Sequence, residues 1–196
     1  MPTQNTVILL FVEGGSDKAF YNALLSFYRD RMGKRLKATY EVIDMKGVGR
    51  YEQKFPNQLK NKWLPKYRDK NIIVFCCYDT DVFSFSEKPP VDWPTVRKKA
   101  QEIGIRQLCE IRAEKMIEDW FLLDLDGLCR FLGIKRPTRL LGKDGYEKMK
   151  ALFKKGNRAY LKGNHDFIPH LNIATIRDSI QSELQILEEK LGVRLT

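Results

Sequence analysis

The most constraining feature of this sequence is a short apolar run at residues 7–12, Val-Ile-Leu-Leu-Phe-Val, followed at 13–15 by Glu-Gly-Gly. Six consecutive large or β-branched apolar residues are too few for a buried helix. They suit a strand covered on both faces, as in a parallel sheet. The glycines permit a tight turn, and Ser16 or Asp17 can cap a helix that begins at Lys18. The sequence therefore predicts a strand, a turn and a helix N-terminus at the entrance of an α/β site, with an acid at its edge.

Apolar patterns along the rest of the chain predict further strands at 39–45, 71–78 and 105–111. Helices are expected at 18–31, 51–67, 92–102, 113–132, 144–155 and 176–191. The predicted fold class is α/β, a Rossmann-like and mostly parallel sheet flanked by helices, with a C-terminal helical extension. We expect residues 1–125 to form the α/β domain and residues 126–196 to form a basic, mainly helical extension packed on it.

Two connecting segments stand out. Residues 46–50, Lys-Gly-Val-Gly-Arg, predict a flexible basic loop. Residues 82–90 contain adjacent prolines and predict a long irregular loop, in which Phe83 and Phe85 are expected to pack or to make contacts.

Positive charge is concentrated in two segments. The net charge is +10, and residues 130–162 hold eleven Lys or Arg against two acids, while residues 46–70 hold eight against two. A polyanionic partner is the natural interpretation, and a solvated lysine-rich surface is the alternative. The residues expected to contact nucleic acid are Lys46, Arg50, Lys54, Arg136, Arg139, Lys143, Lys154, Lys155 and Arg158.

The four cysteines, at 76, 77, 109 and 129, lack the C-x-x-C spacing of a zinc site. Neighbouring residues on a strand point to opposite faces, so the adjacent pair is poorly placed to form a disulfide. We interpret all four as reduced core thiols of a cytoplasmic protein. No apolar run approaches the ~20 residues needed to span a membrane, and the first residues do not resemble a signal peptide.

Acidic residues follow two of the predicted strands. Glu13 closes the first strand, and Asp79 and Asp81 follow the strand at 71–78. The first and third strands are neighbours in the common doubly wound orders, so these carboxylates would crowd together at the carboxyl edge of the sheet. A hard divalent cation such as Mg²⁺ would compensate their repulsion. Taken singly, each acid can also be an ordinary surface or turn residue.

These residues resemble the TOPRIM domain shared by topoisomerases, DnaG-type primases, OLD-family nucleases and RloB-like proteins. The resemblance lies in Glu13-Gly14 after one strand and the Asp-x-Asp at 79–81 after another. The string at 12–18, Val-Glu-Gly-Gly-Ser-Asp-Lys, is most similar to the OLD-family and RloB-like form. Residues 118–122 (Glu-Asp-Trp-Phe-Leu) and 160–163 (Tyr-Leu-Lys-Gly) resemble later segments of small standalone relatives. The resemblance covers residues 6–125 well and the rest loosely.

The resemblance implies a role for each of these acids. Asp79 and Asp81 would hold Mg²⁺ or Mn²⁺. Glu13 would complete the metal site or act as general base on the attacking water. Asp17 and Glu118 would bind a second metal, and two metals would then clamp the attacking and leaving oxygens of a phosphodiester cleavage.

The resemblance also implies that Lys162 stabilises the charge that develops on the phosphate. Each later assignment has a plainer alternative. Asp17 can be only a helix cap, Glu118 can lie on a solvated helix face paired with Lys115 or Arg112, and Lys162 is one of many lysines.

Three functions follow as hypotheses. The first is a Mg²⁺-dependent TOPRIM-type nuclease that cleaves phosphodiester bonds in DNA or RNA, in defence against mobile elements and beside an ATPase partner. In it, the two basic segments would follow the nucleic-acid backbone. The second is a non-catalytic module that binds nucleic acid or a partner protein. The third, an enzyme acting on a small phosphorylated substrate, is disfavoured by the breadth of the basic segments. The choice of DNA or RNA, the cleavage specificity and the oligomeric state stay open.

Overall fold

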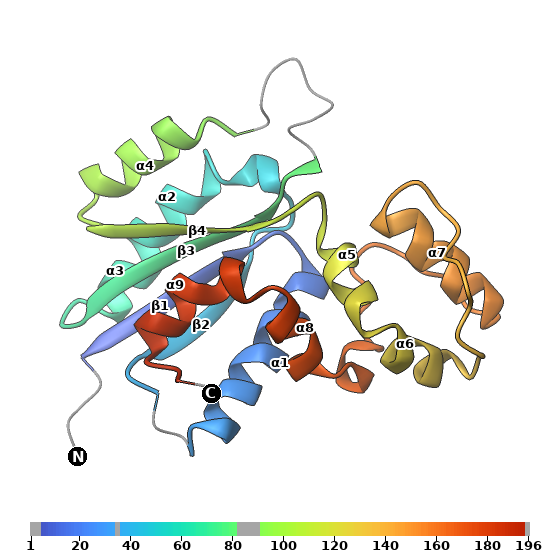
Figure 1. Cartoon of the computed structure of the whole chain (residues 1–196). Helices are drawn as coiled ribbons and strands as arrows, with labels where there is room; N and C mark the ends of the chain where they lie inside the picture. The colour runs from blue at the N-terminus through green and yellow to red at the C-terminus, as the bar shows by residue number, and fades with distance from the viewer. Residues whose placement is uncertain (1–4, 34–35, 82–90, 195–196) are drawn as a thin grey trace.

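The computed structural model describes residues 5–33, 36–81 and 91–194 of the chain (Figure 1). The loop expected at 82–90, with Phe83 and Phe85, lies outside these described residues.

A parallel four-stranded sheet forms the centre of the molecule. Its strands are β1 (Thr6–Val12), β2 (Thr39–Asp44), β3 (Asn71–Asp79) and β4 (Gln107–Ala113), in the spatial order β2-β1-β3-β4. Each neighbouring pair is parallel, so all four carboxyl ends lie at one edge of the sheet. The α/β prediction is confirmed, and so is the expectation that the first and third strands are neighbours.

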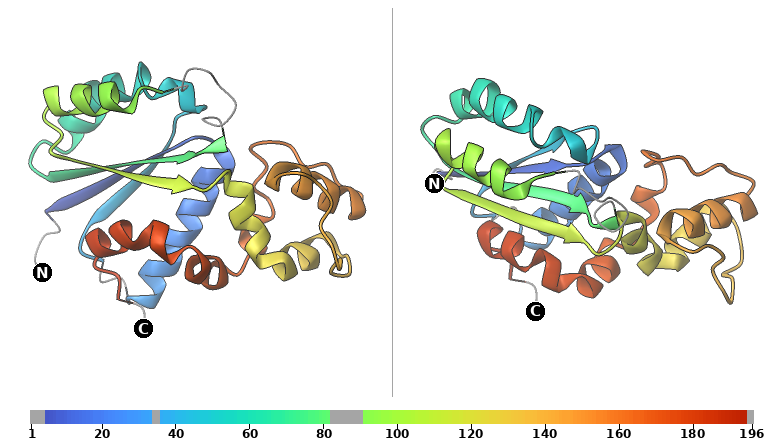
Figure 2. Two further views of the ribbon diagram at one scale, coloured as in Figure 1. Left: turned by 45° about the horizontal axis from the view of Figure 1, so that its top comes forward. Right: turned by 90° about the horizontal axis from the view of Figure 1, so that it is seen from above.

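Helices cover both faces of this sheet (Figure 2). Alternate residues of β1 point to opposite faces of the sheet. Because helices cover both faces, every residue from Val7 to Val12 is fully buried. One face packs against α1 (Gly15–Arg31), α8 (Ile173–Ser179) and α9 (Gln181–Leu191). The other face packs against α2 (Lys54–Gln58), α3 (Leu64–Lys66) and α4 (Trp93–Glu102). This double coverage is the physical reason for the continuous apolar run.

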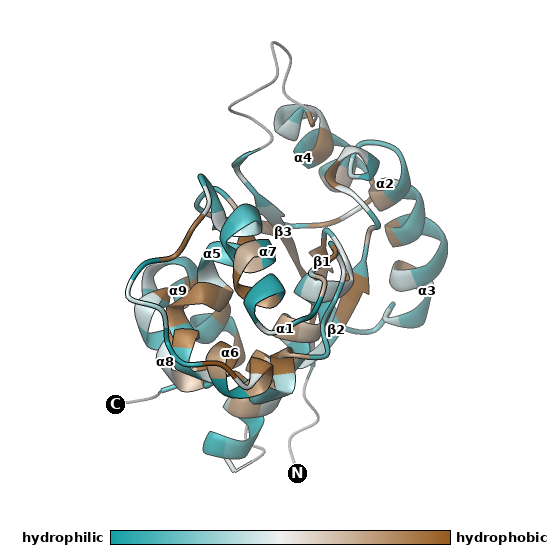
Figure 3. Cartoon of the chain, turned by 90° about the vertical axis from the view of Figure 1, so that its right-hand side faces the viewer, coloured by the Kyte–Doolittle hydropathy of each residue, from teal (hydrophilic) through white to brown (hydrophobic). Residues whose placement is uncertain are grey.

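Three further helices extend beyond the carboxyl edge of the sheet. They are α5 (Ile117–Phe121), α6 (Leu125–Leu132) and α7 (Gly145–Lys155). Figure 3, seen from this side, shows α7 in front of β1 and β3. The expected boundary near residue 125 falls at the start of α6. The chain after it builds α7 and then returns to pack α8 against α1 and α9 against β4.

Two helices begin or break where the sequence patterns predicted otherwise. The first helix begins at Gly15 rather than Lys18, and the N-cap is Gly14, so Ser16 and Asp17 lie in the first turn and are not caps. The single helix expected at 113–132 is divided into α5, a 3₁₀ turn at Leu122–Asp124 and α6. The division occurs because the Asp124 carboxylate accepts the N–H of Gly127 and caps α6.

Similar differences occur elsewhere in the chain. The helix expected at 51–67 begins at Lys54 and contains a π-helical stretch, Leu59–Trp63. Pro65 lies two residues after this stretch and has no N–H to donate to an α-helical turn. The helix expected at 176–191 is two helices, α8 and α9, which meet at Ile180. The fourth strand occupies 107–113 rather than 105–111.

The four cysteines are free thiols; Cys76, Cys77 and Cys129 are buried and Cys109 is half-buried. Among the described residues, no helix is both long and apolar enough to cross a bilayer.

Candidate functional site

A cavity of about 460 Å³ opens at the carboxyl edge of the sheet. Segments far apart in the sequence line it: the turn after β1, the first turn of α1, the loop after β2, the end of β3, the start of α5 and the segment at 162–163. The lining residues that carry charge are Glu13, Asp17, Asp44, Lys46, Asp79, Glu118 and Lys162.

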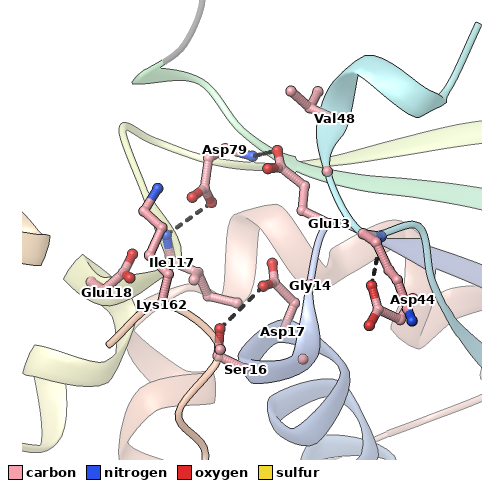
Figure 4. Close-up of a pocket in the computed structure, with 14 residues that line it drawn as sticks. Glu13, Gly14, Ser16, Asp17, Asp44, Val48, Asp79, Ile117, Glu118 and Lys162 are labelled. Atoms are coloured by element: carbon pink, nitrogen blue, oxygen red, sulfur yellow. Dashed lines mark hydrogen bonds between the residues drawn. The ribbon is translucent and has the colours of Figure 1, made fainter. Parts of the chain in front are cut away.

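Glu13 and Asp79 are in direct contact. The Glu13 Oε1 atom accepts the backbone N–H of Asp79 at 2.8 Å, which fixes the end of β1 against the end of β3. The Asp79 side chain in turn accepts the N–H of Ile117 at 2.9 Å and so joins β3 to the start of α5. Figure 4 shows the carboxylates of Glu13, Asp79 and Asp17 facing a common space. The expected meeting of acids from distant strands is therefore present for Glu13 and Asp79.

Two helices contribute the remaining acids of this group. Asp17 is 7% exposed and accepts a long hydrogen bond of 3.4 Å from the Ser16 hydroxyl. Glu118 is 3% exposed and accepts a hydrogen bond of 3.0 Å from the Tyr160 hydroxyl. Glu118 is therefore not on a solvated helix face, and its hydrogen-bond partner is Tyr160 rather than Lys115 or Arg112. We call Glu13, Asp17, Asp79 and Glu118 the acidic cluster.

Burial and mutual repulsion disfavour ionisation of the acidic cluster. Burial, followed by the charges of Asp17 and Glu13, raises the pKa of Asp79 to about 10. Burial also raises the pKa of Glu13 and of Asp17 to about 7, and that of Glu118 is raised by the same cause. The protein without a bound cation thus holds protons on carboxyl groups that ordinarily release them near pH 4.

The donor set of the acidic cluster fits a hard divalent cation. All four groups offer carboxylate oxygens, which Mg²⁺ and Mn²⁺ prefer, and a cation would relieve the repulsion that raises their pKa values. Within the described part of the chain, no three His, Cys, Asp or Glu side chains are already close enough together to hold an ion. The side chains would have to move closer together to hold an ion.

The two remaining predicted catalytic residues lie beside the acidic cluster. Lys162 lines the cavity, and its positive charge lowers the pKa of both Glu13 and Glu118. Its ammonium group lies 5.8 Å from the centre of the Tyr146 ring. Asp81 is not among the lining residues, but its charge raises the pKa of Glu13 and of Asp79, so it lies near both.

The predicted nucleic-acid contacts divide by position. Lys46 lines the cavity, and Arg50 and Lys54 follow it in the loop after β2 and the start of α2. The rest lie in or around α6 and α7 and are exposed: Arg136, Arg139, Lys143, Lys154, Lys155 and Arg158. Three of these also form exposed ion pairs, Arg136 with Asp126, Lys143 with Glu147 and Arg158 with Asp166.

The basic segment at 46–70 does not remain beside the cavity along its whole length. After Lys54 the helical stretch crosses the sheet, and α3 lies at the opposite edge, just before β3 begins (Figure 1). There Lys66 pairs with Glu41 at 2.5 Å. Only the first part of this segment is therefore positioned to contact a ligand of the cavity.

Sequence reasoning missed Asp44, which ends β2 and lines the cavity. Its position in the sequence could have identified it, because Asp44 lies at the carboxyl end of a strand, as Glu13 and Asp79 do. Sequence reasoning also expected a flexible loop at 46–50, whereas residues 48–50 form a 3₁₀ turn and the preceding backbone is hydrogen-bonded to β1.

No protein-family model matches this sequence, and no curated protein matches it. Two solved structures are similar to the chain, and both are of the C-terminal region of the Xanthomonas campestris pv. campestris OLD protein, phased with iodine and with mercury. Each is 14% identical with a TM-score of 0.32; they cover 94% and 93% of this chain, and 100% and 99% of their own. A TM-score of this size does not place the chain in a family.

Proposed function

We propose that this chain is a divalent-cation-dependent nuclease that hydrolyses phosphodiester bonds of DNA or RNA. The observation that carries the proposal is the acidic cluster itself. Four carboxylates, one directly after β1 and the others in α1, β3 and α5, line one cavity that also contains lysines. Such a set is costly to bury without a compensating cation. The order of the motifs, which resembles that of TOPRIM nucleases, supports the same activity.

Hydrolysis joins a water oxygen to phosphorus and breaks the bond from phosphorus to one ester oxygen. The products are a phosphomonoester and a free hydroxyl group. Glu13 faces the cavity and either accepts the proton of the attacking water or helps to hold the cation. Lys162, on the cavity wall, is placed to stabilise negative charge on the phosphate oxygens. Solvent supplies the proton that the departing oxygen takes up.

Asp79, Glu13, Asp17 and Glu118 would hold the cation, with Asp81 beside them. A bound Mg²⁺ or Mn²⁺ would neutralise these carboxylates and polarise the phosphate.

The direct test is cleavage of labelled single- and double-stranded DNA and RNA with Mg²⁺, with Mn²⁺ and with EDTA. We expect cleavage that requires the cation and falls at least ~100-fold in Glu13→Gln and in Asp79→Asn. Asp30→Asn is the matched control, since Asp30 is an exposed acid at the far end of α1. Cleavage that continues unchanged in both cavity variants would refute the proposal.

The same experiment detects the alternative function. A non-catalytic module would bind oligonucleotides with a salt-dependent affinity that persists in EDTA and after loss of the acids, and would cut none of them.

The resemblance to the OLD-family branch supports two wider proposals: that the activity defends against mobile DNA, and that an ATPase acts beside it. Both predict that cells producing the chain with its partner lose protection against phage when Glu13→Gln is introduced.

A further inference from the structure

Two lysine–glycine pairs lie on the walls of the cavity. Lys46 and Gly47 follow β2, and Lys162 and Gly163 come 116 positions later, between α7 and α8. Both glycines have positive φ, 120° at Gly47 and 90° at Gly163. A side-chain carbon placed on either glycine would meet nothing within 4 Å, so the backbone at both points is open to a close approach by a ligand.

The backbone of Lys46 itself is held in an unusual conformation. Its φ is 58°, in the left-handed region that non-glycine residues rarely adopt. Three consecutive N–H groups fix it there. Met45 donates to the Val12 carbonyl at 2.8 Å, Lys46 to the Asp44 carboxylate at 2.7 Å and Gly47 to the Glu13 carbonyl at 2.8 Å. Strained backbone that its surroundings hold this firmly is characteristic of functional sites.

These bonds engage the backbone of Lys46 and not its ammonium group. The Asp44 carboxylate next to it accepts the backbone N–H of Lys46. In the part of the chain that the structure describes, Lys46 forms no ion pair, although it lines the cavity and its side chain is exposed. A fixed backbone thus holds, at the wall of the cavity, a lysine whose ammonium group is in no ion pair among the described residues.

We propose that Lys46 binds the phosphate next to the one that is cleaved. The cavity then binds a nucleic-acid strand through at least two of its phosphates, whereas a small phosphate ester has no second phosphate for Lys46 to contact. This inference rests on the proposed nuclease function, in which Lys162 contacts the phosphate that reacts. Lys46 is a substrate-binding residue that does not touch the reacting atoms.

The variants that test this inference must preserve the left-handed backbone. Lys46→Asn removes the charge and keeps a residue type that tolerates positive φ. Lys115→Asn is the matched control, because Lys115 also has positive φ, 67°, and is exposed. It follows β4, the opposite edge strand of the sheet, and does not line the cavity. Lys46→Arg keeps the charge.

The first measurement is the affinity for a fluorescent single-stranded DNA octamer in Ca²⁺, by anisotropy. A set of octamers carries one neutral methylphosphonate each, at successive linkages. At one linkage we expect the neutral group to weaken the binding of wild type and of Lys115→Asn ~10-fold relative to the unmodified octamer. Lys46→Asn should bind that octamer and the unmodified octamer with equal affinity, because it has already lost the contact. Lys46→Arg should retain the wild-type pattern. The inference is overturned if Lys46→Asn loses the same factor as wild type at every linkage.

The second measurement separates this inference from the proposed function. With Mn²⁺, Lys46→Asn should raise KM for the octamer ~10-fold and leave kcat/KM for bis(4-nitrophenyl) phosphate within about twofold. An equal loss on both substrates would contradict the inference, since Lys46 would then act on the bond that breaks. If wild type cuts neither substrate while the coupling at one linkage persists, the nuclease function fails and the phosphate contact stands.

Discussion

At the residue scale, Asp79 is the centre of the site. Its backbone N–H donates to Glu13, its side chain accepts from Ile117, and burial with the charges of Asp17 and Glu13 raises its pKa to about 10. Without a cation, the burial of this carboxyl group in the cavity therefore lowers the free energy of unfolding at neutral pH.

This cost predicts that Asp79→Asn stabilises the metal-free protein. At pH 8 in EDTA we expect a gain of about 1–2 kcal/mol and a rise in Tm of roughly 2–4 °C per kcal/mol, because an amide keeps the acceptor for Ile117 and needs no proton. Glu110→Gln should do the opposite, since Arg97, Tyr78 and Arg112 all bond this carboxylate. A lower Tm for Asp79→Asn, measured by calorimetry, would be inconsistent with this account.

The acidic cluster also predicts a pH dependence. Glu13 and Asp17 have a folded-state pKa of about 7, above the ordinary value of these side chains in an unfolded chain. Below pH 4 both the folded and the unfolded state hold these protons, so the contribution of the two carboxyl groups to stability is fully present. Between about pH 4 and pH 7 the unfolded chain releases protons that the folded chain retains, and stability falls as the pH rises. Urea unfolding in EDTA at pH 5 and pH 7.5 measures the difference in the free energy of unfolding between these two pH values. The difference should shrink in the Glu13→Gln variant.

At the element scale, patterns local to one segment were predictable and contacts between segments were not. The apolar run of β1 and the turn at Gly14 follow from residue types alone. The breaks at Asp124 and Ile180 do not, because the continuous apolar spacing of 113–132 and 176–191 fits one straight helix equally well. At 124 the Asp124 carboxylate forms a local cap with Gly127 and also a contact with Asn172, from elsewhere in the chain.

Asp124 illustrates such a contact. Its buried carboxylate accepts the N–H of Gly127 at 3.0 Å and that of Asn172 at 2.5 Å, so it joins the starts of α6 and α8. We expect Asp124→Ala to lower the free energy of unfolding by about 2–4 kcal/mol. Asp144→Ala, which removes only the cap of α7, should cost about 1 kcal/mol. Equal costs in chemical denaturation would show that Asp124 does not link the two helices.

At the scale of the whole molecule, topology explains how much of the candidate site the sequence could indicate. Parallel strands bring Glu13 and Asp79 to one edge, so acids that follow strands could be predicted to meet. The left-handed backbone of Lys46 and the bond from Tyr160 to Glu118 depend on the packed structure and have no local signal. Net charge predicted a polyanionic partner, but it did not show that α3 lies at the edge of the sheet far from the cavity.

That arrangement predicts where loss of positive charge matters. Replacing Lys154 and Lys155 at the end of α7 by alanine should weaken oligonucleotide binding and reduce the slope of log affinity against log salt by about 0.7 per lysine that contacts a phosphate. The double variant Lys66→Ala, Arg68→Ala removes the same charge at the far edge and should leave the slope unchanged. Equal effects of the two pairs would show that total charge, and not its position, controls binding.

The most direct test of the central claim, that the acidic cluster gathers to hold a divalent cation, is a crystal soaked in Mn²⁺ and measured at the manganese absorption edge. The account predicts an anomalous peak in contact with Glu13 and Asp79, and its loss in Asp79→Asn. A well-ordered cavity with no peak there, at a Mn²⁺ concentration that saturates other sites on the same molecule, would contradict it.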